Sequence, residues 1–220
     1  MSEHAHPRSQ KWILGLILAL SPTAAMAQEG AAWDAKFGAI PRSPIFMGEL
    51  GYSNIPKLTY SIGVAENFAI GPAFTFDLAY YGTRGGITPG LMFSAPMRIS
   101  LARQGNMSVG LNLEPGLALR FPNGGDVQFG LLLNAGANIG FKIAPQVVLG
   151  GGVDLLLGMI FTPNFAFVIP IFFGPVLEFH ATPQVAITFD MKLGPHITAG
   201  DGGSFTMFGI RVNAGVAYHF

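Results

Sequence analysis

Apolar and polar residues alternate along most of the chain. In the last such run, residues 204–220, Ile210 and Val212 fall on one side of an extended chain, and Arg211 and Asn213 fall on the other. Successive side chains of a β-strand point to opposite faces, so a period of two predicts a strand. The pattern therefore indicates strands that each have one apolar face and one polar face.

The alternation recurs ten times, separated by short segments rich in Gly, Pro, Asn and Asp. The runs cover residues 45–52, 57–64, 68–81, 90–102, 107–121, 127–142, 147–161, 165–180, 184–198 and 204–220. Such short connections are typical of hairpins, so the sheet is predicted to be antiparallel. The first two runs are short, and a sheet without them would contain eight strands.

Two architectures place an apolar strand face differently. In a soluble sandwich it packs against a second sheet, whereas in a membrane barrel it meets lipid and the other face lines the lumen. The second face here carries many glycines and few charges, which suits a crowded interior. Most runs also reach the ~9–11 residues that a tilted strand needs to cross a bilayer. The sequence therefore predicts an all-β fold, an antiparallel up-and-down transmembrane β-barrel of about ten strands, with eight as the alternative.

Composition supports an apolar environment. Of the 220 residues, 50% are hydrophobic and 11% are charged, whereas roughly 25% of residues are charged in an ordinary soluble domain. The formal net charge is zero, which argues against nucleic acid as a partner, because phosphates require a clustered basic surface. The chain has no cysteine, which excludes disulfides and thiolate metal sites.

The N-terminal residues lack the alternation. Arg8 and Lys11 precede the apolar run "WILGLILAL", and small residues follow it, a pattern typical of a secretory signal peptide. The predicted domains are a signal peptide at 1–27, a periplasmic leader or plug at 28–44, and the transmembrane barrel at 45–220.

The final strand carries one specific motif. Its apolar positions lead to an aromatic residue, any residue and a phenylalanine, formed by Val216, Tyr218 and Phe220. This motif resembles the C-terminal assembly signal of small outer-membrane β-barrel proteins of Gram-negative bacteria. The resemblance implies a location in the outer membrane, with membrane lipid and the barrel assembly machinery as partners. It also implies that both termini face the periplasm.

Charged residues on the polar faces are the candidates for chemistry in the lumen. The set comprises Glu49, Asp77, Arg98, Glu114, Arg120, Lys142, Asp154, Glu178, Asp190, Lys192 and Arg211. A regular last hairpin would place Lys192 opposite Arg211. Enclosed charges need partners, so we interpret the set as an internal ion-pair network; the alternative is a charged constriction that selects small solutes.

The predicted function is passive. Because a barrel of eight strands is just filled by its side chains, ten strands predict a narrow or plugged pore, acting as a small-solute channel or a structural envelope protein. The alternative is a barrel hydrolase with Asp126, His196 and Asp201 near the extracellular rim. No local motif supports catalysis or metal binding, so the chain is not expected to be an enzyme or to bind a cofactor.

Prolines inside the predicted strands remove donors from the ladder, and a closed barrel has no edge at which to place them. We expect a β-bulge at each such site. The sites are Pro72, Pro115, Pro170, Pro175 and Pro195.

Overall fold

The protein is described by a computed structural model in six ranges: residues 33–51, 54–80, 87–122, 125–161, 165–201 and 203–220. The predicted signal peptide lies outside these residues. The strands are β1 (Ile45–Gly51), β2 (Asn54–Ala65), β3 (Phe68–Ile70), β4 (Ala73–Tyr80), β5 (Ile87–Ser94), β6 (Met97–Gln104), β7 (Met107–Arg120), β8 (Gln128–Ala144), β9 (Val147–Ile160), β10 (Ala166–His180), β11 (Val185–Gly200) and β12 (Gly203–His219).

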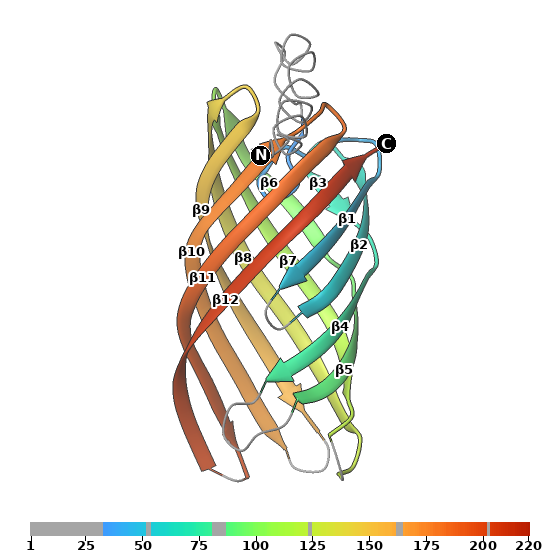
Figure 1. Cartoon of the computed structure of the whole chain (residues 1–220), viewed down its shortest axis with the longest axis vertical. Helices are drawn as coiled ribbons and strands as arrows, with labels where there is room; N and C mark the ends of the chain where they lie inside the picture. The colour runs from blue at the N-terminus through green and yellow to red at the C-terminus, as the bar shows by residue number, and fades with distance from the viewer. Residues whose placement is uncertain (1–32, 52–53, 81–86, 123–124, 162–164, 202) are drawn as a thin grey trace, which may run out of the picture.

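The strands form a tall closed barrel (Figure 1). Closure follows from β1, which pairs antiparallel with both β12 and β2. The start of β1 and the end of β12 lie at the same end of the barrel, at the top of Figure 1, which we call the terminal end. The opposite end, which carries the β11–β12 hairpin, is called the loop end.

Ten strands make up the ring, because two of them are each divided into two segments. β3 and β4 pair with β2 in one register, as Ile62↔Ile70 and Thr59↔Ala73 demonstrate. β5 and β6 likewise pair with β7 in one register. The ten-strand prediction is confirmed, and the eight-strand alternative is wrong because the short β1 and β2 belong to the ring.

The two divisions fall at Pro72 and Pro96, neither of which has an N–H to donate. Pro72 was an expected site of disruption, whereas Pro96 was missed. The expectation of bulges is wrong, because the register runs unshifted through Pro115, Pro170, Pro175 and Pro195. Each proline removes only one bond, and the neighbouring strands hold the register on both sides.

Register shifts occur instead near the terminal end or in the short first strands. They lie between Asn54 and Lys57, Gly63 and Ala65, Ser100 and Ala102, and Lys142 and Ala144. The long central ladders from β8 to β12 are otherwise regular.

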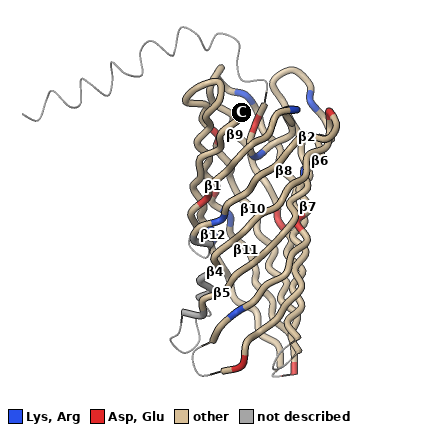
Figure 2. Tube along the Cα trace, turned by 90° about the vertical axis from the view of Figure 1, so that its right-hand side faces the viewer, with Lys and Arg blue, Asp and Glu red and all other residues tan. Residues whose placement is uncertain are grey.

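The two faces of the wall differ as the alternation predicts. On β11, Ile187 is 47% exposed on the outer face, whereas the adjacent Thr188 is 1% exposed on the inner face. Figure 2 shows that most of the trace carries neither acidic nor basic residues. Large hydrophobic side chains are exposed on strands all around the ring, so the outer surface is apolar. No helix among the described residues is long and apolar enough to cross a membrane.

Apolar residues also occur on the inner face, which the sequence indicated to be polar and rich in glycine. Leu132, Leu156 and Ile160 line a cavity together with the buried Val168. These residues lie on the same face of the sheet as Glu114, Asp154 and Glu178, because side chains along a strand alternate between its two faces. The lumen is therefore polar only over part of its length.

Candidate functional site in the barrel lumen

The N-terminal segment, residues 33–39, lies inside the terminal half of the lumen. Asp34 closes it into a compact turn, because its carboxylate accepts a hydrogen bond from the Ala39 N–H at 2.8 Å and its own N–H donates to the Ala39 carbonyl at 2.9 Å. Phe37 is 0% exposed and packs against Val148 and Val176 of the wall. We call residues 33–39 the plug.

Glu178 holds the plug through its backbone. The carboxylate, 0% exposed, accepts hydrogen bonds from the Ala35 N–H at 2.8 and 2.9 Å and from the Lys36 N–H at 3.1 Å. Arg98 contributes from another strand by donating to the Ala35 carbonyl at 2.5 Å. A buried carboxylate needs partners of this kind, so Glu178 and the plug satisfy each other.

Trp33 closes the terminal end of the lumen. Its ring lies 5.2 Å, centroid to centroid, from the rings of both His180 and His219. Its indole N–H donates to the Pro183 carbonyl at 2.9 Å. Trp33 is 3% exposed, so the aromatic group is enclosed by the wall.

Two glycines of the wall make room for Phe37. A Cβ atom at Gly140 would lie 2.6 Å from the Phe37 ring, and one at Gly150 would lie 2.8 Å from it. Real Cβ contacts essentially never approach so closely. The absence of side chains at these two positions therefore allows the plug to seat.

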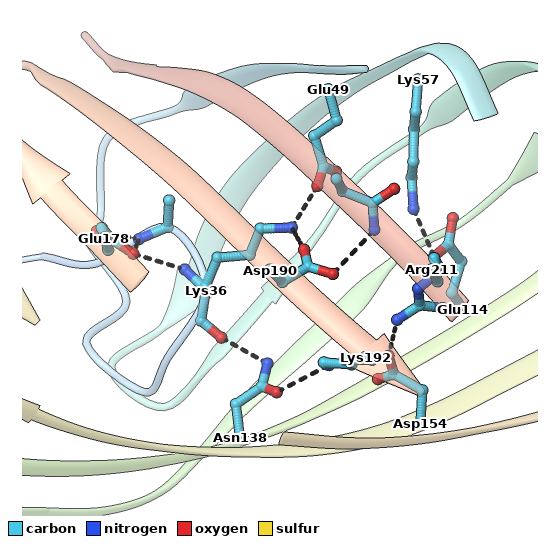
Figure 3. A network of polar contacts seen from close by, with 12 residues as sticks. Lys36, Glu49, Lys57, Glu114, Asn138, Asp154, Glu178, Asp190, Lys192 and Arg211 are labelled. Atoms are coloured by element: carbon cyan, nitrogen blue, oxygen red, sulfur yellow. Dashed lines mark hydrogen bonds and ion pairs between the residues drawn. The ribbon is translucent and has the colours of Figure 1, made fainter. Parts of the chain in front are cut away.

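Ion pairs continue the filled region deeper into the lumen (Figure 3). Lys36 of the plug pairs with Glu49 and lies 3.4 Å from Asp190. Asp154 pairs with Arg211 and, at 2.9 Å, with Lys192. We call these six side chains the ionic belt. Asn138 links its two halves by donating to the Lys36 carbonyl at 2.9 Å and accepting from Lys192 at 3.4 Å.

A second ion pair lies on the opposite wall. Lys57 of β2 pairs with Glu114 of β7 at 2.6 Å, and the Ser94 hydroxyl donates to the same carboxylate at 2.7 Å. The pair crosses from β2 to β7, which are separated by two other strands of the ring. It therefore ties the wall across the inside of the barrel.

Burial changes the acidity of the plug. Burial, together with the neighbouring Glu178, raises the pKa of Asp34 from 3.8 to about 6, and Arg98 opposes this rise. Burial lowers the pKa of Lys36, but Glu49 and Asp190 outweigh burial and hold that pKa above its usual value. Lys36 is therefore a cation held by two carboxylates.

The structure places most of the candidate lumen residues at named contacts. The ionic belt consists of Lys36 together with Glu49, Asp154, Asp190, Lys192 and Arg211. As expected for a regular hairpin, Lys192 of β11 lies directly opposite Arg211 of β12. Arg98, Glu114 and Glu178 lie in the contacts described above. Arg120 lines a cavity towards the loop end, Lys142 lines the terminal mouth, and the side chain of Asp77 lies outside the described ones.

Sequence reasoning missed Lys36 and Lys57. Lys36 lies in a segment without any periodicity, so nothing local assigns it a partner. Lys57 opens a predicted strand, where an end position is normally exposed. One signal could have indicated these lysines. The predicted inner face carries more acidic than basic residues, so further cations are needed to pair with its carboxylates.

The loop-end half of the lumen is different in character. A small pocket lies between β7, β8, β9 and β10, lined mainly by Ala, Gly, Leu, Ile and Val, with Arg120 and Gln128 as its polar groups. Phe172 lies beside the ionic belt, with its ring centroid 5.6 Å from the Arg211 guanidinium carbon.

The terminal mouth holds a larger and more polar cavity of about 160 Å³. It is lined by Trp33 and Asp34 of the plug and by Arg103, Ser108, Lys142 and His180 of the wall, among others. The Ser108 hydroxyl contacts the Asp34 carboxylate at 3.4 Å. Residues of the plug therefore form part of the lining of this cavity.

The residues considered for hydrolysis do not form a cluster. Asp126 and Asp201 are exposed, and the Asp201 carboxylate accepts a hydrogen bond from the Phe165 N–H at 3.2 Å. His196 lies within β11, where it pairs with Pro170 and Met207. Across the described ranges, no group of three or more His, Asp or Glu side chains could hold a metal ion.

Comparison with known proteins gives similarity of fold alone. No family model matches the chain, and no curated protein matches it. The outer membrane protease OmpT from Escherichia coli has a solved structure that is 10% identical, covering 81% of this chain and 94% of that chain, with a TM-score of 0.37. The expectation that the chain is not an enzyme is contradicted by this finding and is withdrawn, because the solved structure is a protease. At 10% identity the similarity assigns no activity to this chain.

Proposed function

We propose that this chain is an outer-membrane β-barrel that works as a small-solute pore, held closed by its own plug. The closed ring and the apolar outer surface support placement in a bilayer. The last strand adds to this, since Val216, Tyr218 and Phe220 are all exposed on the outer face. Residues 1–27 would direct export, and the barrel assembly machinery would read the final strand.

The seated plug is the observation that carries the proposal. Phe37 fills the lumen between two wall glycines, and Lys36 joins the ionic belt. A solute path through the barrel has to pass both. Conduction then requires the plug to move, so the pore would be closed at rest and open rarely.

The terminal end faces the periplasm in this proposal, and the loop end faces outwards. Membrane lipid contacts the exposed apolar side chains between the two ends. Small solutes would reach the loop-end cavity first and stop at the ionic belt. The mixed signs of the belt argue against strong selection by charge.

Gly140→Ala provides the test, because the three atoms nearest to its Cβ would all belong to side chains, the Phe37 ring at 2.6 Å and Val148 at 2.9 Å. The barrel would be reconstituted in planar bilayers and its conductance recorded. We expect rare openings for the natural chain and more frequent openings for the variant, because the methyl group displaces Phe37. The matched control is Gly151→Ala, whose Cβ would have only the Gly174 carbonyl within reach, at 3.5 Å.

Two results would contradict the plugged pore. A natural chain that conducts steadily at the level of the Gly140 variant would mean that the plug closes nothing. Silence in both proteins, together with detergent sensitivity of cells lacking the chain, would indicate a structural envelope barrel instead.

A hydrolase at the loop end is the second candidate, and His196 favours it. Its Nε2 atom is buried without a hydrogen-bond partner among the described residues, and its ring interacts electrostatically with Arg120. An imidazole with a free nitrogen is a candidate general base. Peptide and ester substrates should then be cleaved by the natural chain but not by His196→Ala, and absence of cleavage by the natural chain would remove this candidate.

A further inference from the structure

The cavity at the terminal mouth, which we call the mouth cavity, lies between the plug and the wall. Trp33 and Asp34 line it from the plug, and the β6–β7 turn and the ends of β8 and β10 line it from the wall. Its volume is about 160 Å³. An engineered protein cavity of roughly 150 Å³ holds benzene, so the mouth cavity can hold a molecule of similar size.

Asp34 presents an unpaired acceptor in this lining. Its Oδ2 atom accepts from the Ala39 N–H and lies near the Ser108 hydroxyl, whereas its Oδ1 atom is buried without a hydrogen-bond partner among the described residues. The residue is only 4% exposed. A buried carboxylate oxygen without a donor costs free energy, so a ligand that brings an N–H group to this atom would be favoured.

His180 supplies a second acceptor. It is 4% exposed, its Nε2 atom lies 2.9 Å from Oε1 of Glu178, and its Nδ1 atom has no hydrogen-bond partner in the described part of the chain. A neutral imidazole with its proton on Nε2, facing the carboxylate, keeps a lone pair on Nδ1. Asp34 and His180 therefore form an acceptor side of the mouth cavity, which suits an ammonium group.

A cationic side chain lies nearer the rim. Lys142 is on the inner face of β8, two residues beyond the Gly140 that pairs with Ser108. Its backbone N–H donates to the Asn106 carbonyl of the β6–β7 turn at 2.7 Å. Because Asp34 contacts Ser108, Lys142 stands closer to the terminal end than Asp34 does. No ion pair joins Lys142 to an acidic residue within the described ranges.

A β-bulge brings a second cation to the same rim. Arg98 points inward, where it contacts the plug, and strict alternation from there would send Arg103 outward. The pairing of β6 with β7 shifts by one residue between Ser100 and Ala102. The shift sets Arg103 opposite the inward-facing Ser108, and Arg103 lines the mouth cavity. Bulges commonly redirect a side chain in this way.

We propose that the mouth cavity binds a small zwitterion of the class of free α-amino acids, with its ammonium group at Asp34 and His180 and its carboxylate at Lys142. A simple anion or a simple cation would satisfy only one of the two sides. Arg103 already has an interaction of its own, so it contributes positive charge to the rim and the carboxylate belongs to Lys142. This inference requires the seated plug, but it does not require that the barrel conducts.

Equilibrium dialysis tests the binding site. Radiolabelled L-alanine, which is close to benzene in size, is dialysed at neutral pH against the full barrel in lipid nanodiscs, and we expect saturable binding. Propionate lacks the ammonium group of alanine, and ethylamine lacks its carboxylate. Each should compete about tenfold more weakly than unlabelled alanine, because each loses one charge-assisted contact.

Lys142→Met tests the carboxylate contact from the wall, outside the plug. It should weaken the binding of alanine by about tenfold and leave competition by ethylamine unchanged, because ethylamine has no carboxylate to lose. The control is Arg42→Met, which removes an exposed cation that precedes β1, pairs with Glu66 and does not line the mouth cavity. The control should bind alanine as the natural chain does.

Asp34→Asn tests the ammonium contact. It should weaken the binding of alanine by about tenfold and leave competition by propionate unchanged. The emission of Trp33 reports whether the plug is still seated in this variant, which separates loss of the contact from loss of the plug. If the plug leaves, Lys142→Met still decides the proposal, because Lys142 belongs to the wall.

Absence of saturable alanine binding by the natural chain would overturn the site. Propionate or ethylamine competing as well as alanine would overturn the zwitterion, and equal affinity of Lys142→Met and the natural chain would overturn the assigned carboxylate contact. These outcomes are independent of conductance. A barrel that binds alanine but never conducts would retain this site and lose the proposed pore, and the reverse result would retain the pore alone.

Discussion

Asp34 links the plug to pH at the scale of one residue. Its pKa in the folded protein is about 6, above the 3.8 of an exposed carboxyl group, chiefly because it is buried. A raised pKa means that the folded state binds the proton more tightly. The contribution of Asp34 to docking of the plug is therefore fully present below pH 3.8 and is lost as the pH rises through about 6.

The fluorescence of Trp33 measures this change. With Trp12 replaced by Phe, Trp33 is the single tryptophan, since the chain has two. We expect its emission to shift towards that of a water-exposed indole between pH 4 and pH 6, corresponding to about 3 kcal/mol at most.

Asp34→Asn is the control for the pH experiment, because the neutral amide keeps the size of the side chain but does not titrate. Its emission should stay constant over the same range. A shift that persists in Asp34→Asn would mean that Asp34 does not control docking of the plug.

At the scale of the elements, backbone pairing is less complete in some seams of the wall than in others, and it also skips positions at Pro170 and Pro175 of β10. The seams from β2 to β7 each contain a pair with only one backbone bond, whereas the ladder between β11 and β12 runs unbroken from Val185↔Tyr218 to Gly200↔Gly203. Local opening is easiest where backbone bonds are fewest.

Hydrogen exchange should detect this difference. We expect the amides of Tyr60, Gly71 and Ala95 to exchange faster than those of Thr188 and Asp190 in the β11 ladder, measured by mass spectrometry in nanodiscs. Equal protection of both groups would mean that lipid and side chains compensate fully for the missing bonds.

At the scale of the whole molecule, closure makes the ring cooperative. β1 and β12, the first and last strands of the barrel sequence, pair with each other. Ion pairs across the lumen connect further strands. The closing seam spans only Asn213–His219 of β12 and is therefore shorter than the ladder between β11 and β12. We expect unheated protein to migrate faster than boiled protein on a detergent gel, and identical migration would contradict a closed barrel.

The sequence by itself determined the strands, their order and their faces. Alternation is a local property, so Ile187 and Thr188 could be assigned to opposite faces without any knowledge of their neighbours. The hairpin connections fixed the pairing of consecutive strands, and the regular register of Lys192 with Arg211 followed from the short turn between β11 and β12.

Only the tertiary structure decided what fills the lumen. Lys36 meets Glu49 and Asp190, and Phe37 meets Gly140, because ring closure brings residues distant in sequence around one axis. No local pattern encodes such encounters. The cavity at Leu132 and Leu156 has the same origin: alternation turned these side chains inwards, and the curvature of four adjacent strands determined that they face one another.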